Sequence, residues 1–585
     1  MPNTNSIDSL PTPLIDVAII GGGVSGAYAA YRLMTEANSS PTLQHLLQLS
    51  GKDRLDIRLF ELSDRIGGRL WSYHFPGLFQ YPAELGGMCF NQLQQNVYGL
   101  CTQELGLDTC ACECFTTINL QYLRRHRFSF DQYNPKPEKQ SRNYYPGTIP
   151  YFLTKEEKWK NPVELVIDAL EQAIPGTMQL IKNIQSAVNP PRAATLNEPI
   201  SRHRIQQALK SIQELIMFMR QARVSGKPLS EFGFWNLLAD KLSIEAYQLA
   251  LQATGFYTTY GNWNLYDSFL GFLDFCLQQS YWKLENGYDE LPRKLIEKFT
   301  ELGGSVYLQK QLYGLQLGEY NSEQLMTLTV GPPNVPESVV HARYVVLALP
   351  QRALQRLDPD SFIFQNSQFK ADLNTVTALP ASKLFLVYDQ PWWKGVHYGP
   401  DQKNITAGQS TTDLPLRTCY YIGAEDNDVS LLLASSNDGI ATQFWNGYLQ
   451  ASRSGPHNAP YVGNRGGEIH QDLLAPSDMV REAQRQLAEM HRCHIPDPVM
   501  ALYHNWMDDP FGGGWHFWNP HVQSWEIMPR IRQPIPGINI FLCGEAYSAR
   551  QGWVEGALNT AEMVLETHFG LSRPNWASPD YDFGP

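Results

Sequence analysis

The feature that most constrains the fold is a glycine-rich loop between an apolar run and a helix-like segment. Residues 15–20, IDVAII, predict a buried strand, and GGGVSG follows at once and opens AYAAYRLM. Gly21, Gly23 and Gly26 have the G-x-G-x-x-G spacing, which allows a tight turn, close backbone approach to a pyrophosphate and close packing of helix on strand. Because a helix N-terminus favours negative charge, this segment predicts a dinucleotide site.

A second strand and an acidic residue follow in the order that such a site requires. Residues 56–60, DIRLF, predict the strand, and Glu61 ends it. A carboxylate there can accept the protons of both hydroxyls of an adenosine ribose, and it disfavours a cofactor with a 2′-phosphate. The gap before this acid is longer than usual, and we attribute the excess to a polar, loop-like insertion at 36–54. A glycine-rich turn with a surface glutamate is the alternative.

The composition narrows the classes of partner and compartment. The 585 residues include 46 Lys+Arg and 58 Asp+Glu, a net charge of −12 with no basic run, so we expect no nucleic acid partner. No apolar stretch of about 18 residues occurs, which predicts no membrane span. An N-terminus without signal-peptide features and nine cysteines, read as free thiols, favour a cytoplasmic protein. Cys110, Cys112 and Cys114 lack a second C-x-x-C or a nearby His pair, so we predict no metal site.

A second glycine motif lies shortly after Glu61. It reads Arg65-Ile66-Gly67-Gly68-Arg69. Together with the first loop and the acid, it resembles the opening of the flavin amine oxidase superfamily, which includes L-amino-acid oxidases, monoamine oxidases and polyamine oxidases. The resemblance implies FAD, with Arg69 near the diphosphate, a task that suits a permanent charge on a rigid fork.

The next matching segment is 83–88, AELGGM. In the family it passes beside the flavin ring, so the resemblance places Gly86, Gly87 and Met88 at the cofactor. L-amino-acid oxidases usually carry an arginine directly after this Met, and it clamps the substrate carboxylate. This chain has Cys89, which cannot make that bidentate contact. Either another residue holds a carboxylate, or the substrate has none.

The C-terminal part resembles the family's last flavin motif. Residues 538–543, INIFLC, predict a buried strand before Gly544 and Glu545, and 552–557, GWVEGA, open a helix. The resemblance places Glu545 at the ribityl or phosphate region. It also places the Val554 N–H near flavin N1 and O2, where a helix N-terminus stabilises the charge of the reduced ring. By the same resemblance, Trp553 is one wall of an aromatic cage, and the backbone of Leu312 approaches the adenine.

Two further segments supply candidate catalytic and substrate residues. Lys383 is the odd polar residue in the predicted strand 381–388. In many flavin amine oxidases a lysine in this setting holds a water near flavin N5, although a strand-end lysine can also extend to solvent. The segment 508–518, DDPFGGGWHFW, is rich in glycine and tryptophan, and Trp515 or Trp518 could form the second cage wall. Packing in the core is the alternative for each tryptophan.

The order of motifs predicts an α/β chain with a discontinuous Rossmann-like FAD-binding domain, a mixed α+β substrate domain and a helical insertion, of the amine oxidase and glutathione reductase-like type. We expect residues 1–88, 283–350 and 531–585 in the FAD-binding domain, 89–150 and 351–530 in the substrate domain, and 151–282 in the helical domain. The tail from residue 572, SRPNWASPDYDFGP, is predicted to be an extended arm or disordered.

These expectations favour an FAD-dependent oxidase that acts on an L-amino acid. Hydride transfer to flavin N5 would give an imine, then a 2-oxo acid and ammonia, while O2 would yield hydrogen peroxide. Cys89 favours the alternative of a primary amine or polyamine oxidase. An amino-acid 2-monooxygenase or a tailoring desaturase on the same scaffold, or a non-catalytic flavoprotein, are further alternatives. We expect a homodimer.

Overall fold

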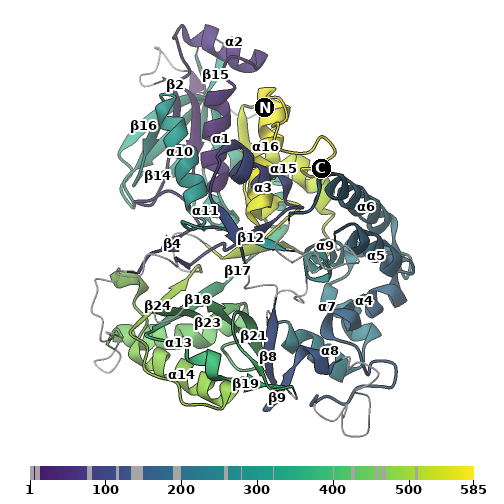
Figure 1. Cartoon of the computed structure of the whole chain (residues 1–585). Coiled ribbons are helices and arrows are strands. Elements are labelled where there is room, and N and C mark those ends of the chain that lie inside the picture. The colour runs from purple at the N-terminus through teal and green to yellow at the C-terminus, as the bar shows by residue number, and fades with distance from the viewer. Residues whose placement is uncertain are drawn as a thin grey trace.

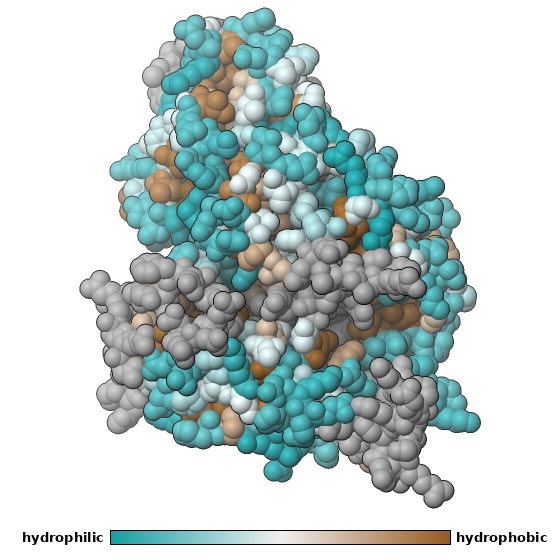
Figure 2. All heavy atoms as spheres, viewed as in Figure 1, coloured by the Kyte–Doolittle hydropathy of each residue, from teal (hydrophilic) through white to brown (hydrophobic). Residues whose placement is uncertain are grey.

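The computed structural model describes residues 5–6, 14–75, 82–112, 117–133, 149–188, 199–255, 261, 263–277, 280–320, 322–399, 401–422, 429–454, 459–461, 463, 470–507 and 512–585. It has three parts: an upper sheet with its helices, a second sheet at the lower left and a group of helices at the lower right (Figure 1). Hydrophilic residues cover most of the described surface on the face that Figure 2 shows. None of the described helices is both long and apolar enough to cross a bilayer.

The upper sheet combines strands from segments that lie far apart in the sequence. Its strand order is β1-β14-β15-β16-β2-β3-β13, and β26 also pairs with β16. The parallel part consists of β2 (Leu14–Ile20), β3 (Ile57–Phe60), β13 (Ser305–Tyr307), β16 (Ser338–Leu347) and β26 (Ile540–Leu542). The antiparallel strands β14 (Gln311–Tyr320) and β15 (Glu323–Gly331) continue it to β1 (Asn5–Ser6), which is parallel to β14.

Both faces of this sheet are covered, which explains why β2 is an almost continuous apolar run. Val17 and Ile19 belong to the core that also includes residues of three helices, whereas Ala18 and Ile20 belong to the core on the opposite face. The three helices are α1 (Val24–Thr35), α10 (Glu290–Glu301) and α16 (Val554–Phe569). The carboxyl ends of the strands therefore meet the start of α1, where the glycine loop lies.

The second sheet has seven strands in the order β24-β18-β23-β22-β21-β8-β9. They are β8 (Ile118–Leu123), β9 (His126–Ser129), β18 (Ala381–Tyr388), β21 (Gly408–Thr412), β22 (Thr418–Ile422), β23 (Ser430–Asp438) and β24 (Met500–Asn505). Helices α13 (Ile440–Ser454) and α14 (Ser477–His491) pack against one face. Lys383 lies on β18, as the sequence predicts a strand there.

The helical part runs from α4 to α9: α4 (Pro162–Ala173), α5 (Thr177–Val188), α6 (Arg202–Gln221), α7 (Phe234–Lys241), α8 (Ile244–Ala253) and α9 (Leu265–Cys276). A capping box starts α4, because Asn161 Oδ1 accepts from Glu164 N at 3.0 Å and Glu164 Oε2 accepts from Asn161 N at 2.8 Å. These helices share one apolar core, as the helical periodicity predicts.

Shorter elements lie within these parts and between them. They are α3 (Gln95–Gly99), α11 (Gln351–Gln355), α12 (Ser367–Leu373), α15 (Ser524–Arg532), β4 (Ser72–Tyr73), β5 (Ala83–Glu84), β6 (Phe90–Asn91), β7 (Thr109–Ala111), β10 (Arg223–Val224), β11 (Lys227–Pro228), β12 (Tyr281–Leu284), β17 (Val376–Leu379), β19 (His397–Tyr398), β20 (Lys403–Asn404) and β25 (Trp515–Trp518). The predicted fold class is confirmed, whereas the domain boundaries stay a prediction.

The structure corrects one local expectation and decides between the two alternatives of another. The insertion at 36–54 is not only loop, because it contains α2 (Pro41–Ser50). Ser40 caps this helix by accepting from Leu43 N, and Gly51 ends it in a left-handed conformation at φ 63°. The C-terminal tail is an extended arm that is docked rather than disordered, since Tyr581 and Phe583 are buried against α6.

Candidate active site

One cavity of about 420 Å³ brings most of the predicted site residues together. Its lining includes Gly21, Gly23, Glu61, Arg69, Gly86, Gly87, Met88, Cys89, Leu312, Lys383, Trp515, Gly544, Glu545, Trp553 and Val554. These residues come from the upper sheet, the second sheet and the segments that link them. Gly26 and Trp518 are the two predicted site residues outside this lining.

The first glycine loop leaves no room for side chains where helix and strand meet. A Cβ on Gly26 would lie 1.9 Å from the carbonyl oxygen of Gly21, and Gly21 itself has φ 106°. Gly67 N donates to Gly22 O at 2.9 Å, so the second glycine motif packs directly on the first. Gly26 therefore acts through packing, while Gly23 at the start of α1 faces the cavity.

The Glu61 carboxylate is held at the end of β3 by donors from two segments. Its Oε2 accepts from Gly22 N at 2.5 Å, and its Oε1 accepts from Ser63 N at 2.8 Å and Ser63 Oγ at 2.7 Å. The residue is only 9% exposed, and it lines the cavity. This places an acceptor at the tip of the second strand, where the sequence predicts it.

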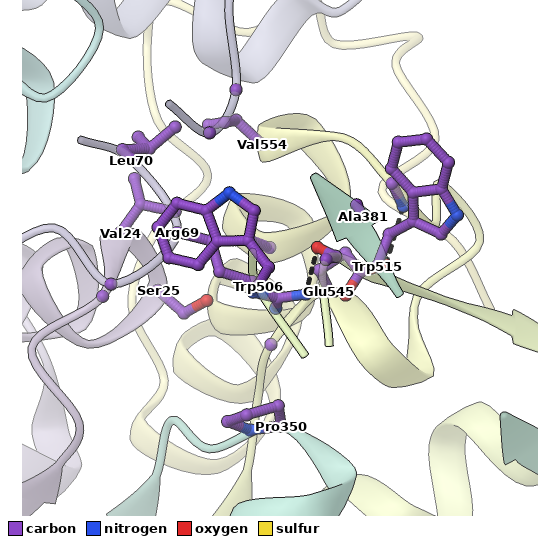
Figure 3. A pocket seen from close by; sticks show the side chains of 18 of the residues that line it. Val24, Ser25, Arg69, Leu70, Pro350, Ala381, Trp506, Trp515, Glu545 and Val554 are labelled. Atoms are coloured by element: carbon purple, nitrogen blue, oxygen red, sulfur yellow. Dashed lines mark hydrogen bonds and ion pairs between the residues drawn. The ribbon is translucent and has the colours of Figure 1, made fainter. Parts of the chain in front are cut away.

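Glu545 joins the C-terminal motif to the second glycine motif. Its Oε2 accepts from Arg69 at 2.8 Å and lies 2.8 Å from His516 Nδ1, and its Oε1 accepts from His516 N at 2.9 Å and Gly552 N at 2.7 Å. Arg69 and Glu545 point toward one another in Figure 3. Burial acts to raise the pKa of Glu545, but Arg69 and His516 outweigh it and hold the pKa well below its ordinary value. The carboxylate is therefore ionised at neutral pH.

The N-terminus of α16 opens onto the same cavity. Trp553 is its N-cap residue, and both Trp553 and Val554 line the cavity. The Trp553 ring stacks on Tyr281, with ring centroids 6.1 Å apart and planes inclined by 12°. Unpaired N–H groups of α1 and α16 thus face one space, which favours an anionic ligand.

Lys383 reaches from the second sheet to the segment before Cys89. Its Nζ donates to the carbonyl oxygens of Glu84, at 2.7 Å, and Gly86, at 2.5 Å. Its neighbour on the paired strand β24 is His504. Burial and the charges of Arg65 and Lys383 lower the pKa of His504 to about 3. Two backbone carbonyl oxygens thus accept hydrogen bonds from the Lys383 side chain. Its side chain does not extend to solvent in the way that the alternative requires.

Aromatic rings and Cys89 form other parts of the wall. Cys89 is buried and lines the cavity. Trp515 and Trp506 also line it. The Trp506 indole N–H donates to Leu85 O at 2.7 Å, which fixes that ring. The Trp515 indole N–H has no hydrogen-bond partner among the described residues. It therefore remains able to donate to a ligand.

The chain was compared with known families over its whole length. The profile described as flavin containing amine oxidoreductase matches residues 25–564. The chain belongs to this flavin-containing amine oxidoreductase family. The predicted resemblance to flavin amine oxidases is thereby confirmed, and a flavin is the cofactor that the family implies.

Similar proteins cover nearly the full chain. Aplysianin-A of Aplysia kurodai is 28% identical over 578 residues, which are 95% of this chain and 90% of the relative. Achacin of Lissachatina fulica is 24% identical over 568 residues, 95% and 93% of the two chains. L-amino-acid oxidase 4 of Hebeloma cylindrosporum is 22% identical over 592 residues, 97% and 84% of the two chains. A redesigned putrescine oxidase has a similar fold, with a TM-score of 0.57 at 15% identity over 94% of this chain and 98% of that chain.

The residues of the cavity fit the flavin of this family. Gly86 lines the cavity with backbone alone, because a Cβ there would lie 1.7 Å from the carbonyl oxygen of Arg69. Two helix N-termini offer positive potential for phosphates, and Glu61 offers an acceptor for ribose hydroxyls. Among the described residues, no group of three or more His, Cys, Asp or Glu side chains could hold a metal ion.

Trp518 is not at the cavity, contrary to the prediction that it could form a cage wall. Successive side chains of β25 alternate between two faces, so Trp515 and Trp518 point to opposite sides. Trp518 is 1% exposed in the core, and its indole N–H donates to Ser548 O at 3.0 Å. The segment 508–511 lies outside the described residues, and so does Cys114.

Sequence reasoning missed part of the lining. Trp263, Ser268, Gly271 and Phe272 line the cavity from α9 and the residues before it. The spacing of Ser268, Gly271 and Phe272 puts them on one helix face, and two small residues on an otherwise bulky helix were an available signal. Trp506 and Tyr420 also line it, and no local motif marks them.

Proposed function

We propose that this flavin amine oxidoreductase is an FAD-dependent L-amino-acid oxidase that forms an imine, then a 2-oxo acid and ammonia, with hydrogen peroxide as the second product. The oxidase part rests on one observation above all: the Lys383 ammonium lies in the wall of the cavity that carries both glycine motifs. The amino-acid part is supported by relatives, including the L-amino-acid oxidase of Hebeloma cylindrosporum. FAD is favoured over smaller flavins because Glu61, which lines the same cavity as Val554, offers an acceptor for an adenosine ribose that a smaller flavin lacks.

The chain's own residues would bind the flavin, orient the substrate and exclude water from the cavity. A bound flavin supplies the chemistry of accepting a hydride from the carbon that bears nitrogen and of passing electrons to O2. Trp515 and Trp553 would confine the substrate amine, and the enclosed aromatic wall would exclude water. Lys383 would hold a proton at Nζ and so place positive charge beside the point where O2 is reduced.

Cys89 favours a second candidate, oxidation of a primary amine or polyamine. The thiol occupies the position where L-amino-acid oxidases usually carry their carboxylate-binding arginine, and it lies in the cavity wall. Arg69, which also lines the cavity, is already bound to Glu545. A substrate without a carboxylate would need no guanidinium at this position.

Anaerobic flavin reduction separates the two candidates. Purified protein would be mixed with L-amino acids and, in parallel, with the amines that result from their decarboxylation. We expect the amino acids to bleach the flavin and to yield one 2-oxo acid per peroxide in air. Bleaching by the amines alone would overturn the proposal in favour of the second candidate, and an amide product would indicate a monooxygenase.

We also propose that the protein is a homodimer and that it is cytoplasmic. A homodimer would be tested by light scattering on a size-exclusion column. The described cysteines are free thiols, which suits a reducing cytoplasm, and cell fractionation would test that location.

A further inference from the structure

The C-terminal tail, defined here as residues 572–585, packs against helices α1, α3, α6 and α16. Ala577, Tyr581 and Phe583 are buried, and they share a small core with Ile205 and Leu209 of α6. In Figure 1 the C-terminus lies between the end of α6 and the helices of the upper sheet. The tail thus connects the helical part with the elements that carry the last flavin motif.

A hydrogen bond joins Tyr581 of the tail to the first turn of α16. The Tyr581 hydroxyl donates to Glu555 Oε1 at 2.5 Å, and Glu555 directly follows the cavity residue Val554. The same carboxylate accepts from Asn96 N at 2.9 Å and Val97 N at 2.7 Å in the first turn of α3. One fully buried carboxylate therefore fixes three chain segments together.

A chain of side-chain hydrogen bonds links Trp576 to Tyr581 beside this carboxylate. The Trp576 indole N–H donates to Asn96 Oδ1 at 3.0 Å, and Asn96 Nδ2 donates to Asn559 Oδ1 at 3.3 Å. Asn559 Nδ2 in turn donates to the Tyr581 hydroxyl at 3.2 Å. Because each donor has an acceptor in the interior, removing one member leaves a buried polar group without its partner.

The start of the tail is fixed to α1. Arg32 donates to Ser572 O and to Glu562 Oε2, both at 2.7 Å, and its guanidinium lies 5.4 Å from the centre of the Trp576 ring. The tail therefore touches both helices whose N-termini open onto the cavity, α1 and α16.

We propose that the tail is a positioning segment of the flavin site, and that Tyr581, acting through Glu555, sets the place of the first turn of α16. The electrostatic effect of a helix N-terminus falls off within one turn, so a small displacement of α16 would weaken its hold on an anionic ring. The inference requires the flavin of the family but not the substrate class proposed above. Its test uses no substrate, so its failure and a failure of the proposed function are distinguishable.

The experiment compares Tyr581→Phe with Tyr503→Phe in the full chain. Tyr503 is a matched control, since it is also buried and its hydroxyl donates to Asn446 Oδ1 at 2.9 Å under the second sheet. Flavin affinity would be measured by titrating apoprotein with FAD, and the midpoint potential by reduction against a reference dye. We expect about tenfold weaker FAD binding and a more negative potential for Tyr581→Phe only, because the first turn of α16 loses the hydrogen bond that holds it in place.

Two C-terminal deletions test the same proposal without relying on Tyr581→Phe alone. Deletion of 582–585 removes Phe583 but retains the Tyr581 hydroxyl, whereas deletion of 579–585 removes both. Only the longer deletion should reproduce the loss of affinity. The proposal is overturned if Tyr581→Phe lowers the melting temperature as Tyr503→Phe does while FAD affinity and midpoint potential stay at wild-type values, or if both deletions weaken binding equally.

Discussion

Replacing Glu545 by glutamine should destabilise the protein even without flavin. The Glu545 side chain is 6% exposed and its partner Arg69 is 24% exposed, so the substitution leaves a largely buried guanidinium without its counter-charge. The new amide N–H₂ would also face Arg69 and His516 Nδ1, where the carboxylate has an acceptor. Breaking one side of a buried ion pair costs roughly 3–5 kcal/mol, and the partial exposure of Arg69 favours the low end, about 3 kcal/mol.

Urea unfolding of flavin-free protein at neutral pH, followed by tryptophan fluorescence, measures this cost. A double-mutant cycle with Arg69→Met isolates the pair, because the double variant has neither charge and should lose less free energy of unfolding than the two single variants summed. A cost below about 1 kcal/mol for Glu545→Gln, or strict additivity in the cycle, would refute the reasoning, since exposed pairs behave in that way.

The pH dependence of the same variant has a definite sign. The native pKa of Glu545 is lower than the value of about 4.3 for an unfolded glutamate. Its contribution is therefore present above that pH and is lost as pH falls through the native pKa. The difference between wild type and Glu545→Gln should be constant from about pH 5 to 8 and should shrink below about pH 4.

Three other perturbations have definite expected outcomes. Lys383→Met should slow reoxidation of reduced flavin by O2 in stopped flow much more than flavin reduction, and equal effects on both would remove its assigned role. Gly26→Ala should abolish soluble folding, because its Cβ would meet a carbonyl oxygen at 1.9 Å, whereas Gly447→Ala, with nothing within 4 Å, should fold normally. Burial raises the pKa of Asp267 to about 7, so its ionisation favours the unfolded chain as pH rises from about 4. Asp267→Asn should therefore raise the melting temperature at pH 8 more than at pH 5, and Asp240→Asn, whose side chain is 68% exposed, should not; no pH-dependent gain for Asp267→Asn would contradict the burial argument.

Residues predicted correctly to share a cavity belong to short contiguous motifs. The spacing of Gly21 and Gly23, the acid that ends the next strand and the Glu545 segment all reflect geometry set within a few residues of each motif. That Arg69 contacts Glu545 could be expected only from the family resemblance, because nothing local relates two segments so far apart in the chain.

The residues that the sequence did not place correctly depend on the alternation of side chains along a strand and on the docking of distant elements. Trp515 and Trp518 could not be told apart as cage walls because no strand was predicted at 515–518, and in β25 side chains three residues apart point to opposite faces. The α9 residues reach the cavity only through the docking of the helical part. The tail was predicted to be an extended arm or disordered, because its prolines and acidic residues give no periodicity, and its docking depends on long-range partners such as Glu555.

The central claim is that a flavin in this cavity takes two electrons from a carbon bearing nitrogen and passes them to O2. Absorbance of the purified protein under anaerobic conditions tests it most directly. We predict a flavin spectrum that an L-amino acid bleaches, and that air restores with release of one peroxide per flavin. A folded protein that stays colourless after reconstitution with FAD, or a bound flavin that neither amino acids nor amines reduce, would contradict the claim.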